Sequence, residues 1–373
     1  MYNIPKKNRN LLIDYLRALT IIYIICWIHL LYWWHPERTI LKSWFLGEMI
    51  IIFFLMGASY TSSSQKKYRY YLAIRLQRIY IPYFVYAIAL CIYVVAYHYI
   101  RYNEISSHLV ISNFTHWINP FKMFNLKGNI AIIPFVSWHL WFIPTAIVVI
   151  PFIPLAHQFA SNVKKYITLI MIMTILLSLI SIYDEYFLIN LPDPLIYFDY
   201  ILFYLIIVCL GFKFNELQAG KPWIKILSIF ILLIVIFLLN RFLGLSLDMQ
   251  ENKFPPNIIY LLFGFIWIMT ISLFICKLHN INKSSYIKKY LLWFSKYSYT
   301  AYLYHPFAYL LLFYLKTEIY KPLNIEFINK MTIPFFILFL VSFLIFIFGR
   351  IERIVFFEPR LREMSNSKFT KIS

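Results

Sequence analysis

The chain has 373 residues, of which 61% are hydrophobic, and its mean hydropathy of +0.69 excludes an ordinary soluble domain. Its formal net charge of +19 comes from 35 lysines and arginines set against 16 acidic residues. We attribute this charge to loops that face anionic lipid headgroups, and we expect membrane lipids but no nucleic acid among its partners. The four cysteines form no CxxC pair, so we expect membrane-core side chains rather than disulfides or metal ligands.

Ten apolar segments follow one another along the chain. A helix of about 20 apolar residues spans the roughly 30 Å hydrocarbon core of a bilayer. The sequence therefore predicts an all-α polytopic membrane protein, a bundle of about ten transmembrane helices. We expect one domain over residues 1–363 and a polar, disordered tail at 364–373. The predicted spans are 11–34, 41–61, 80–100, 139–157, 166–183, 195–212, 223–243, 257–276, 290–315 and 332–350.

The charges of the loops predict the orientation. Most lysines and arginines fall at the two ends of the chain and in every second loop. Cytoplasmic loops carry such an excess of basic residues, so we predict an even number of spans with both termini in the cytoplasm. The composition is typical of a bacterial protein, and we expect a multi-pass protein of the bacterial cytoplasmic membrane. The longest outer loop, 101–137, is aromatic and is expected to contain an interfacial or re-entrant piece.

Ionisable residues interrupt the first two spans. The first span carries Asp14 and Arg17 near its inner end and His29 towards its outer end, and Glu48 in the second span lies at a depth like that of His29. Such groups cost roughly 3 kcal/mol each in lipid, so they usually face a protein interior or a watery cavity. His29 and Glu48 are expected to pair. For Arg17, the alternative is a side chain that extends to the inner interface.

Further polar residues are expected at the outer ends of later spans. His139 and Asp199 begin their spans, and His305 lies past the middle of its own. These residues could gather in the outer half of the bundle. The alternatives are an interfacial-belt residue for His139, a loop residue for Asp199 and a kinked-helix cap for His305, which precedes Pro306.

A basic group marks the inner face before the third span. Arg75 and Arg78 are one helical turn apart, and Lys66 and Lys67 precede them. Arginine binds phosphate bidentately, so this group suits a phosphate-bearing substrate. The alternative is an ordinary inside-positive loop.

Five stretches in this order resemble one family. They are Asp14–Ala18 with the apolar run to His29, Phe53–Gly57 (FFLMG), Arg75–Tyr83 (RLQRIYIPY), Trp138–Phe142 (WHLWF) and Ser298–Pro306 (SYTAYLYHP). Over residues 10–350 the chain resembles the acyltransferase 3 family of bacterial integral-membrane O-acyltransferases, in the stand-alone form without a soluble extension.

The resemblance implies transfer of an acyl group, expected to be acetyl, from cytosolic acyl-CoA to a hydroxyl of an extracytoplasmic or lipid-linked glycan. Acyl-CoA is then a donor substrate, and we expect no permanently bound cofactor and no metal. Histidine suits the role of general base, so we assign it to His29, oriented by Glu48. Arg17 would hold the carbonyl or pantetheine arm. The expected acyl-CoA-binding residues are Arg75, Arg78, Lys66 and Lys67, and the possible cavity-lining residues are Asp14, His139, Trp141, Asp199, Tyr299 and His305.

The first helix departs from the family in its spacing. The family places ten residues between its arginine and histidine, whereas eleven separate Arg17 from His29. In a regular α-helix the shorter spacing leaves the two within about 20° of one face, and the longer one separates them by about 120°. A π-bulge adds one residue to one turn and would restore the facing. We therefore predict a one-residue bulge between Arg17 and His29. Ala18 and Met56 also replace the family's glycine and serine.

Two other classes of function use similar chains. A transporter or flippase of lipid-linked saccharides would use the same cavity without a base, and inverted repeats, which we do not find, would favour it. A glycan polymerase or ligase would be expected to carry a large acidic and basic outer loop, whereas 101–137 is mainly aromatic. An assay of acyl-CoA hydrolysis or transfer separates the three.

Overall fold

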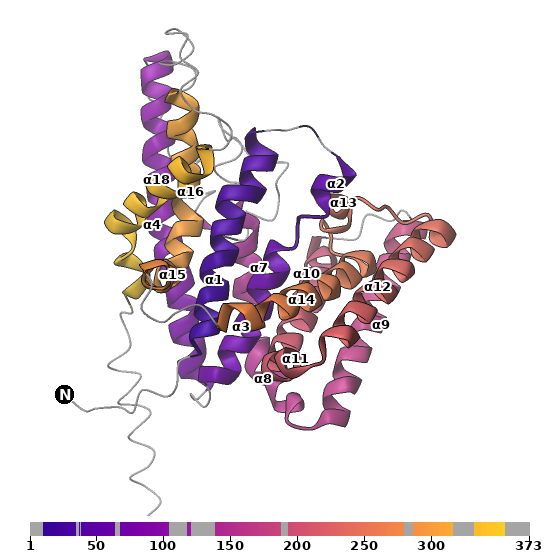
Figure 1. The fold of residues 1–373 in the computed structure, drawn as a ribbon. Helices are drawn as coiled ribbons and strands as arrows, with labels where there is room; N and C mark the ends of the chain where they lie inside the picture. The colour runs from indigo at the N-terminus through magenta and orange to yellow at the C-terminus, as the bar shows by residue number, and fades with distance from the viewer. Residues whose placement is uncertain are drawn as a thin grey trace, which may run out of the picture. The chain divides into compact units, whose positions relative to one another are not determined.

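The computed structural model describes residues 10–34, 37, 39–63, 68–103, 118–120, 139–187, 193–279, 286–315 and 332–354. Within these ranges the secondary structure is helical and contains no strand, which confirms the all-α class (Figure 1). The chain divides into two compact units, Met1–Gln65 with Pro151–Lys296 and Lys66–Ile150 with Tyr297–Ser373. The predicted outer-loop piece within 101–137 and the tail at 364–373 lie almost wholly outside the described residues.

Six of the described helices are long and apolar enough to cross a membrane, and a seventh span results if His139–Val149 and Phe152–Ala160 act as one. Phe198–Phe212 and Ile333–Phe348 are shorter apolar helices. These elements coincide with nine of the ten predicted spans. The count of ten and the cytoplasmic termini stay predictions. The six are Leu11–Trp33, Ile40–Ser62, Tyr68–Ile100, Val163–Ser181, Pro222–Leu243 and Ile258–Ile275.

Two predicted spans differ from the structure. The span predicted over 290–315 is two helices, which break at Tyr297. The first of them, Tyr286–Lys296, carries three lysines in 11 residues, so it is amphipathic rather than apolar on all sides. The span predicted over 139–157 is broken before Phe152, because Pro151 lacks a backbone N–H and restricts the residue before it.

The first unit contains the N-terminal helices and the middle of the chain. In chain order its elements are α1 (Leu11–Tyr23), the π-helices η1 (Ile24–Ile28) and η2 (Leu30–Trp34), α2 (Ile40–Ser43), α3 (Glu48–Ser63), α8 (Phe152–Ala160), α9 (Val163–Phe187), α10 (Asp193–Phe212), α11 (Phe214–Ala219), α12 (Pro222–Leu243), α13 (Met249–Asn252), α14 (Ile258–His279) and α15 (Tyr286–Lys296).

Helices α3 and α10 pack backbone against backbone. A Cβ atom added to Gly57 would lie 2.0 Å from the carbonyl oxygen of Val208, and one added to Gly211 would lie 2.1 Å from that of Phe54. Small residues allow this approach between membrane helices, where lipid tails remove the hydrophobic drive to associate. Close packing of α3 fixes the helix that begins with Glu48.

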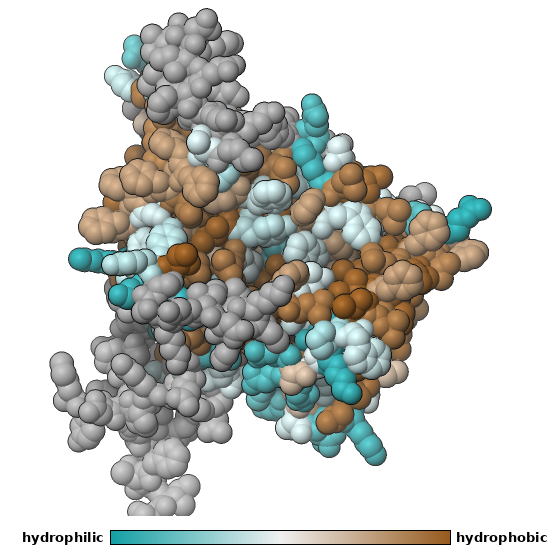
Figure 2. Space-filling model, in the orientation of Figure 1, coloured by the Kyte–Doolittle hydropathy of each residue, from teal (hydrophilic) through white to brown (hydrophobic). Residues whose placement is uncertain are grey.

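Helix α12 presents an apolar surface. Only 6% of its apolar membrane-spanning stretch is buried inside the protein. Trp223, Phe230 and Phe237 are each at least 60% exposed. Figure 2 shows apolar side chains along the surface that α12 and α9 form. Lys225 is the exception, because it is buried and its Nζ donates to the carbonyl of Ser272 in α14 at 3.2 Å. An apolar surface of this kind suits contact with lipid.

The second unit contains α4 (Tyr68–Tyr102), η5 (His139–Trp141), α7 (Phe142–Val149), α16 (Ser298–Tyr314), α18 (Ile333–Phe348) and η7 (Ile351–Arg353). Helix α16 packs against both α4 and α18. The Glu352 carboxylate accepts from the backbone N–H of Thr300 at 3.0 Å and from its hydroxyl at 2.9 Å, so it caps the first turn of α16.

Candidate functional site

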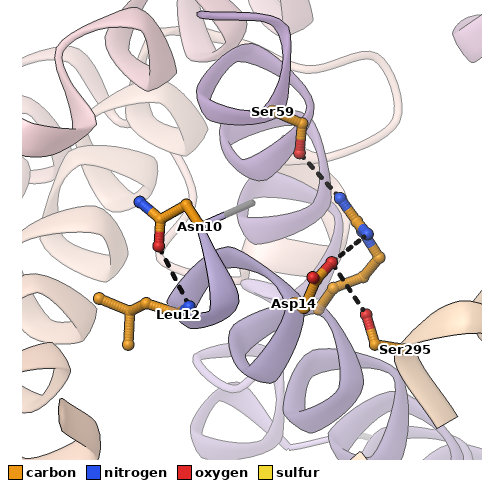
Figure 3. Close-up of polar contacts among 6 residues, drawn as sticks. Asn10, Leu12, Asp14, Ser59 and Ser295 are labelled. Atoms are coloured by element: carbon orange, nitrogen blue, oxygen red, sulfur yellow. Dashed lines mark hydrogen bonds and ion pairs between the residues drawn. The ribbon is translucent and has the colours of Figure 1, made fainter. Parts of the chain in front are cut away.

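A polar cluster near the start of α1 includes Asp14, Ser59 and Ser295 (Figure 3). The Arg17 guanidinium donates from Nη1 to the Asp14 carboxylate at 3.1 Å and from Nη2 to the Ser59 hydroxyl at 2.8 Å. The Ser295 hydroxyl donates to the same oxygen of Asp14 at 3.4 Å. Residues of α1, α3 and α15 thus meet around one cation. The Arg17 side chain is 33% exposed and the Asp14 side chain is 6% exposed, so the arginine is held by protein contacts while part of its side chain stays accessible.

The predicted bulge in the first helix is confirmed. Ile24–Ile28 forms a π-helix, and the backbone N–H of His29 donates to the carbonyl of Ile24, five residues earlier. The extra residue of the π-turn lies between Arg17 and His29, where the spacing required it. A second π-helix, Leu30–Trp34, follows directly. Turns of this kind are rare and occur frequently at functional sites.

His29 lies between the two π-turns and is partly exposed. Its ring stacks on that of Trp33, with the centroids 4.0 Å apart and the planes 6° from parallel. The stack fixes the plane of the imidazole ring. The base role assigned to His29 stays a prediction.

Glu48, the first residue of α3, forms a buried ion pair with Lys253. The Lys253 Nζ lies 2.5 Å from Glu48 Oε1, and each side chain is 4% exposed. The expected pairing of Glu48 with His29 stays a prediction, and the ion-pair partner that the structure records for Glu48 is Lys253. Burying two charges is costly unless they are paired this closely.

Two of the predicted cavity-lining histidines come together in the second unit. The rings of His139 and His305 are 5.1 Å apart, and both side chains are buried. Tyr302 connects them, because its hydroxyl donates to the His139 carbonyl and its own carbonyl lies 2.6 Å from His305 Nδ1. A carbonyl oxygen only accepts, so this contact assigns the proton of a neutral His305 ring to Nδ1.

The remaining predicted residues are distributed over both units. Asp199 is buried in α10 of the first unit. In the second unit, Trp141 is buried in η5, and the Tyr299 hydroxyl donates to the Ile79 carbonyl at 3.0 Å. Their cavity-lining roles stay predictions.

The predicted acyl-CoA-binding residues lie near the start of α4. The Arg75 guanidinium carbon lies over the Tyr71 ring, 5.7 Å from its centroid, and Arg78 is exposed one turn further. Lys66 and Lys67 lie outside the described residues. The phosphate-binding role of this group stays a prediction. Among the residues that the structure describes, no group of three histidines, cysteines or acids is arranged to hold a metal ion.

Several polar partners were not found from the sequence. Ser59 and Ser295 look like ordinary small residues of their helices, and Lys253 looks like a loop charge. Their roles depend on contacts with residues 42, 281 and 205 positions away. The sequence offered one indication: Glu48 lies within an apolar span, where a charged group usually needs a partner.

These features define a helical membrane protein with a charged cluster and a π-distorted helix in one unit and a buried histidine pair in the other. A family model described as an acyltransferase domain matches residues 10–349. The chain therefore belongs to this acyltransferase family, which confirms the resemblance seen in its motifs. A comparison with curated proteins and one with solved structures gave no match.

Proposed function

We propose that this protein transfers an acyl group, expected to be acetyl, from cytosolic acyl-CoA to a hydroxyl of an extracytoplasmic or lipid-linked glycan. Membership of the acyltransferase family supports acyl transfer as the reaction class. The observation that carries the proposal further is the π-turn at Ile24–Ile28, because it absorbs the extra residue between Arg17 and His29. A distortion at that position supports the view that Arg17 and His29 must face the same side of the helix for function.

The donor side is assigned to the arginines. Arg75 and Arg78 would bind the phosphates of acyl-CoA, for which the guanidinium fork is suited. Arg17 would hold the thioester carbonyl or the pantetheine arm. Its guanidinium is held by Asp14 and Ser59, and its side chain is 33% exposed, which supports a binding role for this residue.

The chemical step is assigned to His29. A sugar hydroxyl is a poor nucleophile near neutral pH, so a base within hydrogen-bond reach accelerates its attack. The imidazole of His29 takes the hydroxyl proton while the oxygen forms a bond to the acyl carbonyl carbon. The carbon–sulfur bond then breaks, and CoA leaves as a thiolate, which takes the proton from the His29 imidazolium and so restores the neutral base. Glu48 is proposed to orient the imidazole, as carboxylates do in other base–orienter pairs.

The test uses purified protein in proteoliposomes with radiolabelled acetyl-CoA and a glycolipid extract from the source membrane. We expect label in the glycolipid fraction and equimolar release of CoA. A protein that moves glycolipid across the bilayer without releasing CoA would overturn the proposal in favour of a flippase. His29→Ala supplies the control for acetyl-CoA hydrolysis that does not depend on the site.

A further inference from the structure

The segment between α12 and α14 delivers a lysine into the interior of the first unit. This segment contains the short helix α13 and ends at Asn257, directly before α14. Lys253 extends from it to Glu48 and is 3% exposed as a residue. An ion pair at a surface would need no such burial. Burial of a lysine in an apolar interior costs free energy, so we look for a functional reason for its position.

Two hydrogen bonds fix this segment against the end of α2. The Trp44 indole N–H donates to the Leu247 carbonyl at 3.1 Å. The backbone N–H of Met249 donates to the Ser43 hydroxyl at 2.9 Å. Ser43 is the last residue of α2 and Trp44 is its C-cap, so both bonds hold the segment within five positions of Glu48, the first residue of α3.

The segment is also braced internally. The Asn252 side-chain amide donates to the Ser246 carbonyl at 2.7 Å, and the Asn257 amide donates to Asn252 Oδ1 at 2.6 Å. Asn252 is itself 3% exposed. Asn252, the residue before Lys253, is thus bonded to residues on both sides of it in the chain. These bonds restrain the backbone from which the Lys253 side chain extends. Such a braced loop is unlike the mobile connections that usually join helices.

Only one of the two carboxylate oxygens of Glu48 has a hydrogen-bond partner among the described residues. Oε1 binds Lys253, while Oε2 is buried without a hydrogen-bond partner among the described residues. A carboxylate can accept about four hydrogen bonds, and a buried acceptor without one costs free energy comparable to a lost hydrogen bond. An oxygen kept in this state is available to a donor that arrives during function.

We propose that Lys253 is a positioning residue of the transferase. It supplies the countercharge of Glu48 and occupies Oε1, which leaves Oε2 to accept the ring N–H of His29 when the acceptor is bound. His29 belongs to the same unit and begins the turn after the π-helix Ile24–Ile28. This inference rests on the proposed function, because it gives Glu48 the orienting role in acyl transfer.

The experiment compares four variants in the radiolabelled acetyl-CoA assay, with kcat referred to folded protein. Lys253→Met should lower kcat by about 10²-fold, the lower limit of what a positioned base contributes, with the KM for acetyl-CoA unchanged. Lys253→Arg should keep kcat within about tenfold, because it retains the charge and the donor. Lys213→Met removes a more exposed partner of Glu216 and should leave both kcat and the thermal midpoint unchanged.

The double variant Glu48→Gln with Lys253→Met separates a structural role from a functional one. It removes both buried charges, so its thermal midpoint should return towards that of the wild type, above that of Lys253→Met. Its kcat should stay low. A double variant that regains kcat together with stability would show a structural pair and overturn the proposal, even where Lys253→Met alone fails to fold. A wild-type protein that transfers no acetyl group would overturn the proposed function and this inference with it.

Discussion

The backbone N–H of His29 donates to the carbonyl of Ile24, five residues earlier in the first helix. A regular α-helix would join His29 to Ile25 instead. The additional residue in this turn compensates for the eleven residues that separate His29 from Arg17. The bond therefore connects a backbone distortion to the spacing of two side chains with proposed roles.

Removal of the bulge tests this connection. Deletion of Cys26, which lies in the π-turn, should allow a regular helix and keep His29 facing as it does now. We expect the deletion variant to keep most of its acetyl transfer. An alanine inserted after Cys26 should instead rotate His29 by about 100° and abolish transfer. Equal losses in the two variants, both shown to be folded by size-exclusion chromatography, would contradict the role of the bulge.

His29→Ala should lower acetyl transfer by about 10²–10⁴-fold, because a general base contributes that much to proton removal. The variant should insert into the membrane and fold as the wild type does. Radiolabelled acetyl transfer measures the loss. Near-full activity in His29→Ala would move the base to the buried pair of His139 and His305.

Arg78→Ala should raise the apparent KM for acetyl-CoA, because one of the two expected phosphate contacts is removed. The kcat should change little, since the phosphates lie away from the reacting carbon. Arg241→Ala, an exposed arginine in the last turn of α12, is the matched control and should leave KM unchanged. An unchanged KM in the Arg75→Ala and Arg78→Ala double variant would reject the assignment.

Gly57→Ala should destabilise the first unit by about 1–3 kcal/mol, because its Cβ would lie 2.0 Å from a backbone carbonyl that cannot rotate away. Gly264→Ala is the control, since its Cβ would meet only side-chain atoms, the nearest 3.3 Å away. Thermal unfolding in detergent measures the difference. A midpoint for Gly57→Ala as high as that for Gly264→Ala would contradict the close packing of α3 against α10.

Cysteine labelling tests the orientation in the membrane. With the native cysteines replaced, a cysteine within 184–193 should react with an impermeant maleimide added from outside intact cells, and one within 283–289 should react only after lysis. This follows from the excess of basic residues in the loops assigned to the cytoplasm. The opposite pattern would reverse both termini.

The amino-acid sequence by itself determined the features that depend only on residues close together in the chain. Apolar segment length predicted the helical membrane class, and residue counting predicted the π-turn, because helix rotation depends only on the number of residues between Arg17 and His29. The motif order indicated the family over residues 10–350, and its model matches 10–349. The break at Tyr297 was missed, since hydropathy averaged over a window joins the amphipathic α15 to the apolar α16.

Only the tertiary structure decided which polar groups meet. Asp14 and Arg17 share a helical turn, but Ser295 reaches the Asp14 carboxylate from 281 positions away. Glu48 required a counterion in the apolar interior, and nothing local distinguished Lys253 from the other loop lysines. Their contact joins residues 205 positions apart. It forms because the segment between α12 and α14 is hydrogen-bonded to the end of α2, shortly before Glu48 begins α3.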